Sequence, residues 1–241
     1  MSWTRVRAIF RKELREYRRN GFILATMAIV PLFFIVLPMI EVFAASPSTP
    51  AAHSLLKGGP LTYMLGIPAI VPTTAAAFAI VGERQQGTLE PVLSTPVRRE
   101  EFLIAKALAV MAPSLAISYG WYCFVLVCAA LFANPELSAA IFRAPELLAQ
   151  VVFTPLIAGW SISSSIAISA RSSDVRVAQQ LGSLVSLPPL AMAVLVSFYV
   201  VHPTAGLVIG LAALLVLVDT LGWKAMLAMF NRERLVVGAK T

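Results

Sequence analysis

The chain has 241 residues, of which 59% are hydrophobic and only 13% are charged. Soluble domains carry roughly 25% charged residues, so too few polar side chains are present to cover a water-soluble globule. Composition therefore excludes a soluble protein and predicts an integral membrane protein. In a membrane protein, a net charge of +7 is first compared with the positive-inside rule, which relates Lys and Arg to the cytoplasmic side.

The first segment in chain order, residues 1–20, contains a helical pattern from Trp3 to Arg19. Its apolar side chains recur at roughly i, i+3, i+4 and i+7, namely Trp3, Val6, Ile9 or Phe10, Leu14 and Tyr17. Arg and Lys fill the remaining face. We expect this helix to lie in the membrane interface, with aromatic rings at the acyl boundary and basic side chains at anionic lipid headgroups. A simple topological anchor is the alternative.

The rest of the chain is dominated by apolar segments that are long enough to cross a bilayer. A membrane-crossing helix needs about 20 predominantly apolar residues. Six segments qualify: Phe22–Phe43, Leu61–Val81, Phe102–Phe132, Leu147–Ala170, Leu181–Val201 and Ala205–Phe230. The predicted fold is therefore an all-α membrane protein with six transmembrane helices, and residues 1–241 are expected to form one domain.

The basic residues divide unequally between the two sides of these spans. Of the 19 Lys and Arg residues, Lys57 and Arg143 fall in connections on one side, and the other 17 fall on the opposite side. The positive-inside rule then places both termini in the cytoplasm. We expect a multi-pass protein of the plasma (inner) membrane. No nucleic-acid partner is needed, because topology accounts for the basic excess.

The most polar stretch, Gly82–Glu101, lies between the second and third spans and thus on the basic side. Its first seven residues read G-x-x-x-x-G-T, which is close to the phosphate loop G-x-x-x-x-G-K-[ST] of ATP-binding proteins. The lysine that would contact the phosphates is missing, and no buried strand precedes the motif. A nucleotide-binding loop is therefore not expected here.

The local pattern of this stretch predicts a short helix, a break and a new helix. Residues 83–86 continue the second span out of the bilayer, and Leu89, Val92 and Leu93 form an apolar patch at i, i+3 and i+4. Thr95–Pro96 has the pattern of an N-cap followed by proline at the first helical position. Two interpretations remain open at this point: a docking surface for a soluble partner, and a solvated hairpin that only turns the chain.

The same stretch carries a family resemblance. Glu83–Val97 reads E-R-Q-Q-G-T-L-E-P-V-L-S-T-P-V and closely resembles the segment after the second span of ABC type-2 transporter permeases. Val92 replaces the leucine that is usual in that pattern. The plan of the whole chain also agrees, with a basic amphipathic start, six spans, short loops and cytoplasmic termini.

The resemblance implies the membrane subunit of an ATP-driven exporter. Segment 83–97 would be the coupling helix that contacts a separate ABC ATPase subunit, and residues 1–20 would be the interfacial elbow helix. The residues implied in ATPase coupling are Glu83, Arg84, Gly87, Thr88, Leu89, Glu90, Val92 and Leu93. ATP would be bound by the partner subunit, so this chain needs no cofactor. A second copy or a paralogue would complete the substrate path, within membrane lipid.

Several polar residues fall inside the predicted spans. A carboxylate within a span is costly and usually faces the bundle interior or water, so Asp219 is a candidate for lining a translocation path, with a headgroup-level position as the alternative. The fourth span carries a run of serines, for which close helix packing is the commoner use and a polar path wall the alternative. The candidate path residues are Asp219, Ser161, Ser164 and Ser165.

Three other classes of function compete with this interpretation. An intramembrane enzyme would need His/Glu ligands or a Ser–His pair within the membrane, but His53 and His202 both fall at the outer surface, so we predict no catalytic residue and no metal site. An ion-driven secondary transporter would use buried ionisable groups, for which Asp219 is the candidate. A non-transporting scaffold explains the spans but gives segment 83–97 no role.

Overall fold

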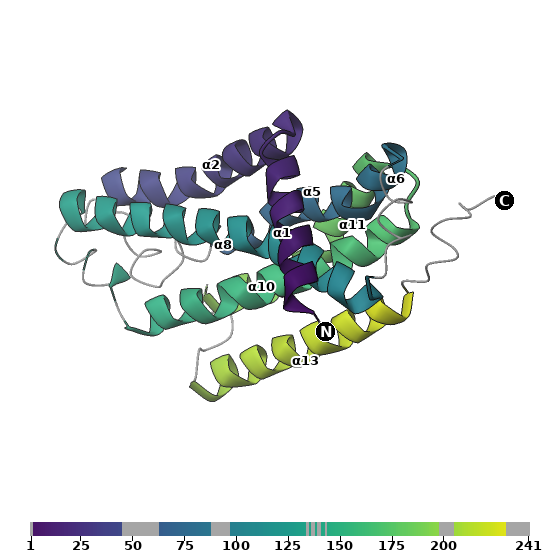
Figure 1. Ribbon diagram of the computed structural model, residues 1–241. Coiled ribbons are helices and arrows are strands. Elements are labelled where there is room, and N and C mark those ends of the chain that lie inside the picture. The colour runs from purple at the N-terminus through teal and green to yellow at the C-terminus, as the bar shows by residue number, and fades with distance from the viewer. Residues whose placement is uncertain are drawn as a thin grey trace.

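The computed structural model describes residues 2–44, 63–87, 97–133, 135, 138, 141–142, 144–197 and 205–229, which are helical with no strand among them (Figure 1). The elements in chain order are α1 (Trp3–Tyr17), α2 (Gly21–Ala44), α5 (Gly66–Ala77), the π-helix η1 (Phe78–Gly82), α6 (Glu83–Gln85), α8 (Arg99–Phe132), α10 (Ala144–Arg171), α11 (Val175–Val185), α12 (Leu187–Ser197) and α13 (Ala205–Met229). The all-α prediction is confirmed for this part of the chain.

Five of the six predicted spans appear as helices that are long and apolar enough to cross a membrane. They are Gly21–Ile40, Gly66–Gln85, Arg99–Phe132, Leu147–Arg171 and Ile209–Leu227. The fifth predicted span, Leu181–Val201, falls instead on α11 and α12, two helices of 11 residues each, and its last four residues lie outside the described ranges. The count of six spans therefore stays a prediction.

The break between α11 and α12 has a local cause. Proline has no N–H, so the carbonyl four residues before Pro189, that of Val185, loses its helical donor. The indole Nε1–H of Trp160, on α10, donates to this carbonyl at 2.9 Å. A side chain of a neighbouring helix thus satisfies a backbone group that the proline leaves free, as apolar surroundings require.

The core of the bundle lies around α5. Residues such as Val71, Ala75 and Ala76 are completely buried there, and the helix packs against α2, α8, α10 and α11. By contrast α2 and α13 form the margins of the bundle (Figure 1) and expose large apolar side chains, including Phe33 and Ile209. A small-residue central helix permits close approach of its neighbours, and the exposed apolar margins suit hydrocarbon surroundings.

The N-terminal helix α1 runs across the other helices rather than along them and packs on α8 (Figure 1). It ends at Tyr17, so the helix predicted over Trp3–Arg19 is confirmed to within its last turn. Its location in a membrane interface stays a prediction. The end of the bundle where α1, α6 and the first turns of α8 meet is called the α1 end below.

Candidate functional site

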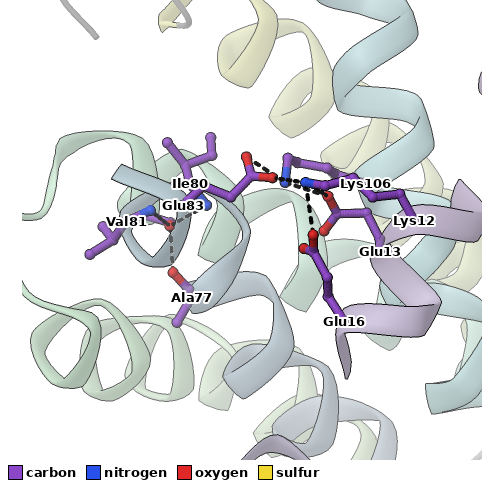
Figure 2. Close-up of polar contacts among 9 residues, drawn as sticks. Lys12, Glu13, Glu16, Ala77, Ile80, Val81, Glu83 and Lys106 are labelled. Atoms are coloured by element: carbon purple, nitrogen blue, oxygen red, sulfur yellow. Dashed lines mark hydrogen bonds and ion pairs between the residues drawn. The ribbon is translucent and has the colours of Figure 1, made fainter. Parts of the chain in front are cut away.

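At the α1 end, five charged side chains from three helices form one network. Figure 2 shows Lys12, Glu13 and Glu16 of α1 pointing toward Glu83 of α6 and Lys106 of α8. Lys106 Nζ lies 2.9 Å from Glu13 Oε1 and 3.0 Å from Glu83 Oε2. The network therefore links the N-terminal helix, the first turn after the second span and the third span.

The second lysine of the network, Lys12 of α1, contacts all three carboxylates. Lys12 Nζ lies 2.5 Å from Glu83 Oε1, 3.5 Å from Glu13 Oε1 and 3.2 Å from Glu16 Oε1. The side chains of Lys106, Glu13 and Glu83 are 0%, 3% and 7% exposed, whereas Lys12 and Glu16 are 36% and 49% exposed. Buried charges are tolerated only when they are well paired, so the three inner groups depend on one another.

Ordinary helix periodicity places the inner charges against each other. Glu13 lies on the buried line of α1 with Val6 and Tyr17, at i, i+7 and i+11. Lys106 lies one turn after Phe102 on α8, and its ammonium is 4.9 Å from the centre of that ring. Both charges therefore stand on the apolar, packed faces of their helices.

The network holds two ammonium groups and three carboxylates. Burial raises the pKa of Glu13, and the nearby Glu83 raises it further, although Lys106 acts in the opposite direction. Burial lowers the pKa of Lys12, but the hydrogen bond and charge of Glu83 outweigh this and hold it above its ordinary value. The carboxylates around Lys12 thus secure its positive charge.

The three carboxylates could be mistaken for a metal site. Oxygens of Glu13, Glu16 and Glu83 lie within 4.8 Å of one another. Both lysine ammonium groups, however, already lie among these oxygens, at 2.5–3.5 Å from them. A divalent cation would have to share this space with two positive charges, so the arrangement fits an ion-pair network and not a metal centre.

A second contact ties the start of α1 to the start of α8. Glu101 accepts hydrogen bonds from the backbone N–H of Ser2 at 2.6 Å and of Arg98 at 3.2 Å, and Arg5 lies 3.6 Å away. The helix begins at Arg99 with Arg98 as its N-cap, so the N-cap predicted at Thr95–Pro96 is wrong. A carboxylate that binds the N-cap N–H, together with a contact from a distant segment, fixes the helix start.

The second span reaches this site through a π-helical turn. The wider turn of η1 disturbs the regular α-helical hydrogen bonds. Ser169, on α10, compensates: its Oγ accepts from the N–H of Ile80 at 3.3 Å and of Val81 at 3.1 Å, and its hydroxyl donates to Ala77 O at 2.6 Å. Figure 2 shows these three backbone partners beside Glu83. The turn is therefore held in place by α10.

The short helix α6 is also held from the opposite side. Arg84 donates to the backbone carbonyl of Ser172, and Gln85 Nε2 donates to that of Ser173 at 3.1 Å, in the connection between α10 and α11. Gly87 follows with φ +68°, the left-handed conformation that commonly ends helices. The direction in which the chain leaves α6 is thus set by a glycine and by contacts with α1, α8 and the α10–α11 connection.

The predicted coupling residues are only partly described. Glu83, Arg84 and Gly87 lie at the anchored end of the segment, whereas Thr88, Leu89, Glu90, Val92 and Leu93 lie outside the described residues. Sequence reasoning missed Lys12 and Lys106 as partners of Glu83, and Glu13 as a further partner of both lysines. A usable indication existed, because Glu13 is in phase with the apolar face of α1 and Lys106 interrupts an apolar run of α8.

The candidate path residues lie elsewhere in the bundle. Ser161 and Ser165 are completely buried, and their hydroxyls have no hydrogen-bond partner among the described residues, while Ser164 bonds to the carbonyl of Trp160, on its own helix. The carboxylate of Asp219 lies against Gly159: a Cβ added to Gly159 would be 3.1 Å from Oδ2 of Asp219. Its Oδ1 is buried without a hydrogen bond within the described ranges. A role of these groups in a path stays a prediction.

Comparison with protein families decides the class of the molecule. The family model described as ABC-2 family transporter protein matches residues 7–201. The chain belongs to this family. A comparison with curated proteins gave no match. The molecule is thus a permease of the ABC type, a membrane component that is generally not itself catalytic, and the resemblance of Glu83–Val97 is confirmed at the level of the family.

Proposed function

We propose that this permease is the membrane subunit of an ATP-driven exporter and that segment 83–97 transmits movement from a separate ATPase subunit. The observation that carries the proposal is the buried network around Lys106 and Glu83, which holds the first residue of the segment. ABC-2 permeases associate in general with an ABC ATPase. ATP would be bound by that partner, and this chain would need no cofactor.

A coupling segment must be rigidly attached at its base, because a flexible joint would absorb the displacement. Here the base is α6, which contacts α1 and α8 through the network and the α10–α11 connection through Arg84 and Gln85. The helix η1 continues directly into α5, the buried centre of the bundle. A push on residues 88–96 would therefore reach several spans as a rigid-body movement.

Other observations support the proposed partner copy and orientation. The exposed apolar faces of α2 and α13 offer surfaces for lipid and for a second permease copy or paralogue, which would complete the path. The unequal distribution of Lys and Arg supports cytoplasmic termini and a plasma-membrane location. The α1 end would then face the cytoplasm, where an ATPase is available. Export, rather than import, is proposed from the family resemblance.

A second candidate function has one observation in its favour. Asp219 is partly buried in α13, and its Oδ1 lacks a hydrogen bond within the described residues. A buried carboxylate of this kind is typical of ion-driven carriers. That function would give the anchored segment after Glu83 no purpose, so we place it second.

The proposal is tested by separating hydrolysis from conformational change. The permease and its ATPase are reconstituted, and ATP hydrolysis and hydrogen–deuterium exchange in α5 and α8 are measured with and without ATP. We expect Leu89→Asp and Glu90→Lys to abolish the ATP-dependent change in exchange because they weaken docking of the ATPase, which still hydrolyses ATP on its own. Leu55→Asp, in a connection predicted on the opposite side, is the control and should behave like the wild type. An ATP response that persists in both segment variants would refute the coupling role.

A further inference from the structure

Beside the contact between α1 and α8 lies an apolar groove that the permease function does not use. Its volume is about 450 Å³, within the range of roughly 300–1,000 Å³ that is usual for small-molecule sites. Trp3, Val6 and Phe10 line it from α1, and Leu108, Met111 and Ala112 line it from α8. The groove thus has the composition of a site for a hydrocarbon chain.

One cation completes the lining of the groove. Arg7 lies on α1 between the apolar residues and is exposed, as are Trp3 at 65% and Leu108 at 40%. Arg11 follows one helical turn later on the same side of α1. The surface of the groove is almost entirely apolar, so Arg7 lines it with its aliphatic stem. An apolar trough flanked by two exposed arginines of α1 is complementary to a molecule that carries both a hydrocarbon chain and an anionic group.

The depth of the groove in the bundle fits such a molecule. Helix α8 has 34 residues and is about 51 Å long, whereas the hydrocarbon core of a bilayer is about 30 Å thick. About 21 Å of the helix must therefore lie outside the hydrocarbon, and the first turn, with the charged residues Arg99, Glu100 and Glu101, is the part suited to that position. Leu108–Ala112 begin about 14 Å from the helix start, which with this placement of α8 would put them near the boundary between the headgroups and the acyl chains.

A second copy of the chain is a poorer occupant than a lipid. In a two-fold contact the same patch faces itself, so Arg7 and Arg11 of both copies would be brought together. The repulsion would oppose association, whereas a lipid phosphate would be attracted by the same charges. Helix α1 is strongly basic along its exposed side, which favours an anionic partner.

We propose that this groove binds one anionic glycerophospholipid, with an acyl chain along Trp3 and Leu108 and the phosphate at Arg7. The bound lipid would fill the junction between the N-terminal helix and the third span. The inference is independent of the ATPase, because it rests on the groove and not on segment 83–97.

Trp3 supplies the reporter for a test. The full chain is reconstituted in vesicles of phosphatidylglycerol and phosphatidylcholine in which either lipid carries brominated chains, and the quenching of Trp3 is taken as the difference between wild type and Trp3→Phe. We expect brominated phosphatidylglycerol to quench Trp3 about fivefold more effectively than its mole fraction predicts. This factor corresponds to the attraction of about 1 kcal/mol between one basic side chain and an anionic lipid. Equal quenching by both lipids would overturn the proposal.

Two variants distinguish a built site from diffuse attraction. Arg7→Gln should reduce the preference to near one, whereas Arg15→Gln, about 12 Å further along α1 and outside the groove lining, should preserve it. Ala112→Phe should reduce the quenching of Trp3 by both lipids, because the larger side chain fills the groove. If Arg7→Gln and Arg15→Gln reduced the preference for phosphatidylglycerol equally, the lipid would be attracted to the whole helix, and the proposal would also be overturned.

Discussion

Glu13 and Lys106 are 93 residues apart in the chain, yet their side chains form an ion pair of 2.9 Å that is almost completely buried. The pair fastens the N-terminal helix to the third span. Lys106 also reaches Glu83 at 3.0 Å, so the same ammonium holds the base of the predicted coupling segment. Lys106 therefore joins α8 to both α1 and α6.

Lys106→Met should destabilise the permease strongly. The change leaves the carboxylates of Glu13 and Glu83 buried with one lysine fewer, and breaking a buried pair costs about 3–5 kcal/mol. Thermal unfolding in detergent should show a clearly lower Tm. Lys224→Met, at an exposed position on α13, is the control and should change stability by less than about 0.5 kcal/mol.

The double variant Lys106→Met/Glu13→Gln refines that test. Removing the charge of Glu13 takes away one of the two uncompensated carboxylates, so part of the lost Tm should return. A double variant that is less stable than Lys106→Met would contradict this account, because it would show that the Glu13 carboxylate remains favourably paired, through Lys12, after Lys106 is removed.

The stability contribution of Glu13 should depend on pH with a definite sign. Its pKa is raised, so between the ordinary and the raised value the folded protein binds more protons than the unfolded chain, and stability falls as pH rises. Glu13→Gln lacks this titration. The Tm advantage of wild type over the variant should be largest below about pH 4 and should shrink toward neutral pH. An advantage that grows with pH would mean that Lys106 lowers the pKa instead.

Ser169→Ala should loosen the π-helical turn. The amides of Ile80 and Val81 would lose their acceptor in a buried environment, at a cost of about 1–3 kcal/mol. Hydrogen–deuterium exchange at these two amides should become faster. Ser172→Ala is a matched control, because the Ser172 hydroxyl, which follows α10, donates to the carbonyl of Ile168 on that helix and does not bond to the amides of the π-helical turn. Unchanged exchange in Ser169→Ala would contradict this role.

Gly87→Ala should strain the exit from α6. The residue has φ +68°, and a Cβ there would meet no atom within 4 Å, so the expected cost of about 1–2 kcal/mol is conformational and not steric. Gly120→Ala also meets no atom within 4 Å but lies inside α8, where alanine should be neutral or stabilising. Comparable Tm losses in the two variants would argue against a left-handed Gly87.

The spans could be predicted from sequence because length and apolarity decide them almost alone. Helix α2 was predicted at Phe22–Phe43 and runs over Gly21–Ala44, since an apolar run has few other stable conformations in a membrane. The π-turn η1 could not be predicted, because the serine that satisfies its backbone lies on α10, 89 residues after Ile80. Local composition does not reveal such a partner.

The charge network was missed for a related reason. A charged residue on an amphipathic helix is usually solvated, and only tertiary packing shows that Glu13 and Lys106 face each other. The start of α8 was placed at Thr95–Pro96 by local preference, but the contacts of Glu101 with Ser2 and Arg98 fix it at Arg99. In both cases a contact between distant segments overrides a local pattern.

The most direct test of the account is purification of the tagged permease from its native membrane in mild detergent, with identification and ATPase assay of what remains bound. We predict a stoichiometric soluble ATPase that is retained by wild type and by Leu55→Asp but lost from Leu89→Asp. Recovery of the permease alone under several gentle conditions, without ATP hydrolysis, would contradict the ATP-driven function. The ion-driven carrier would then become the leading candidate, with Asp219 as the residue to test.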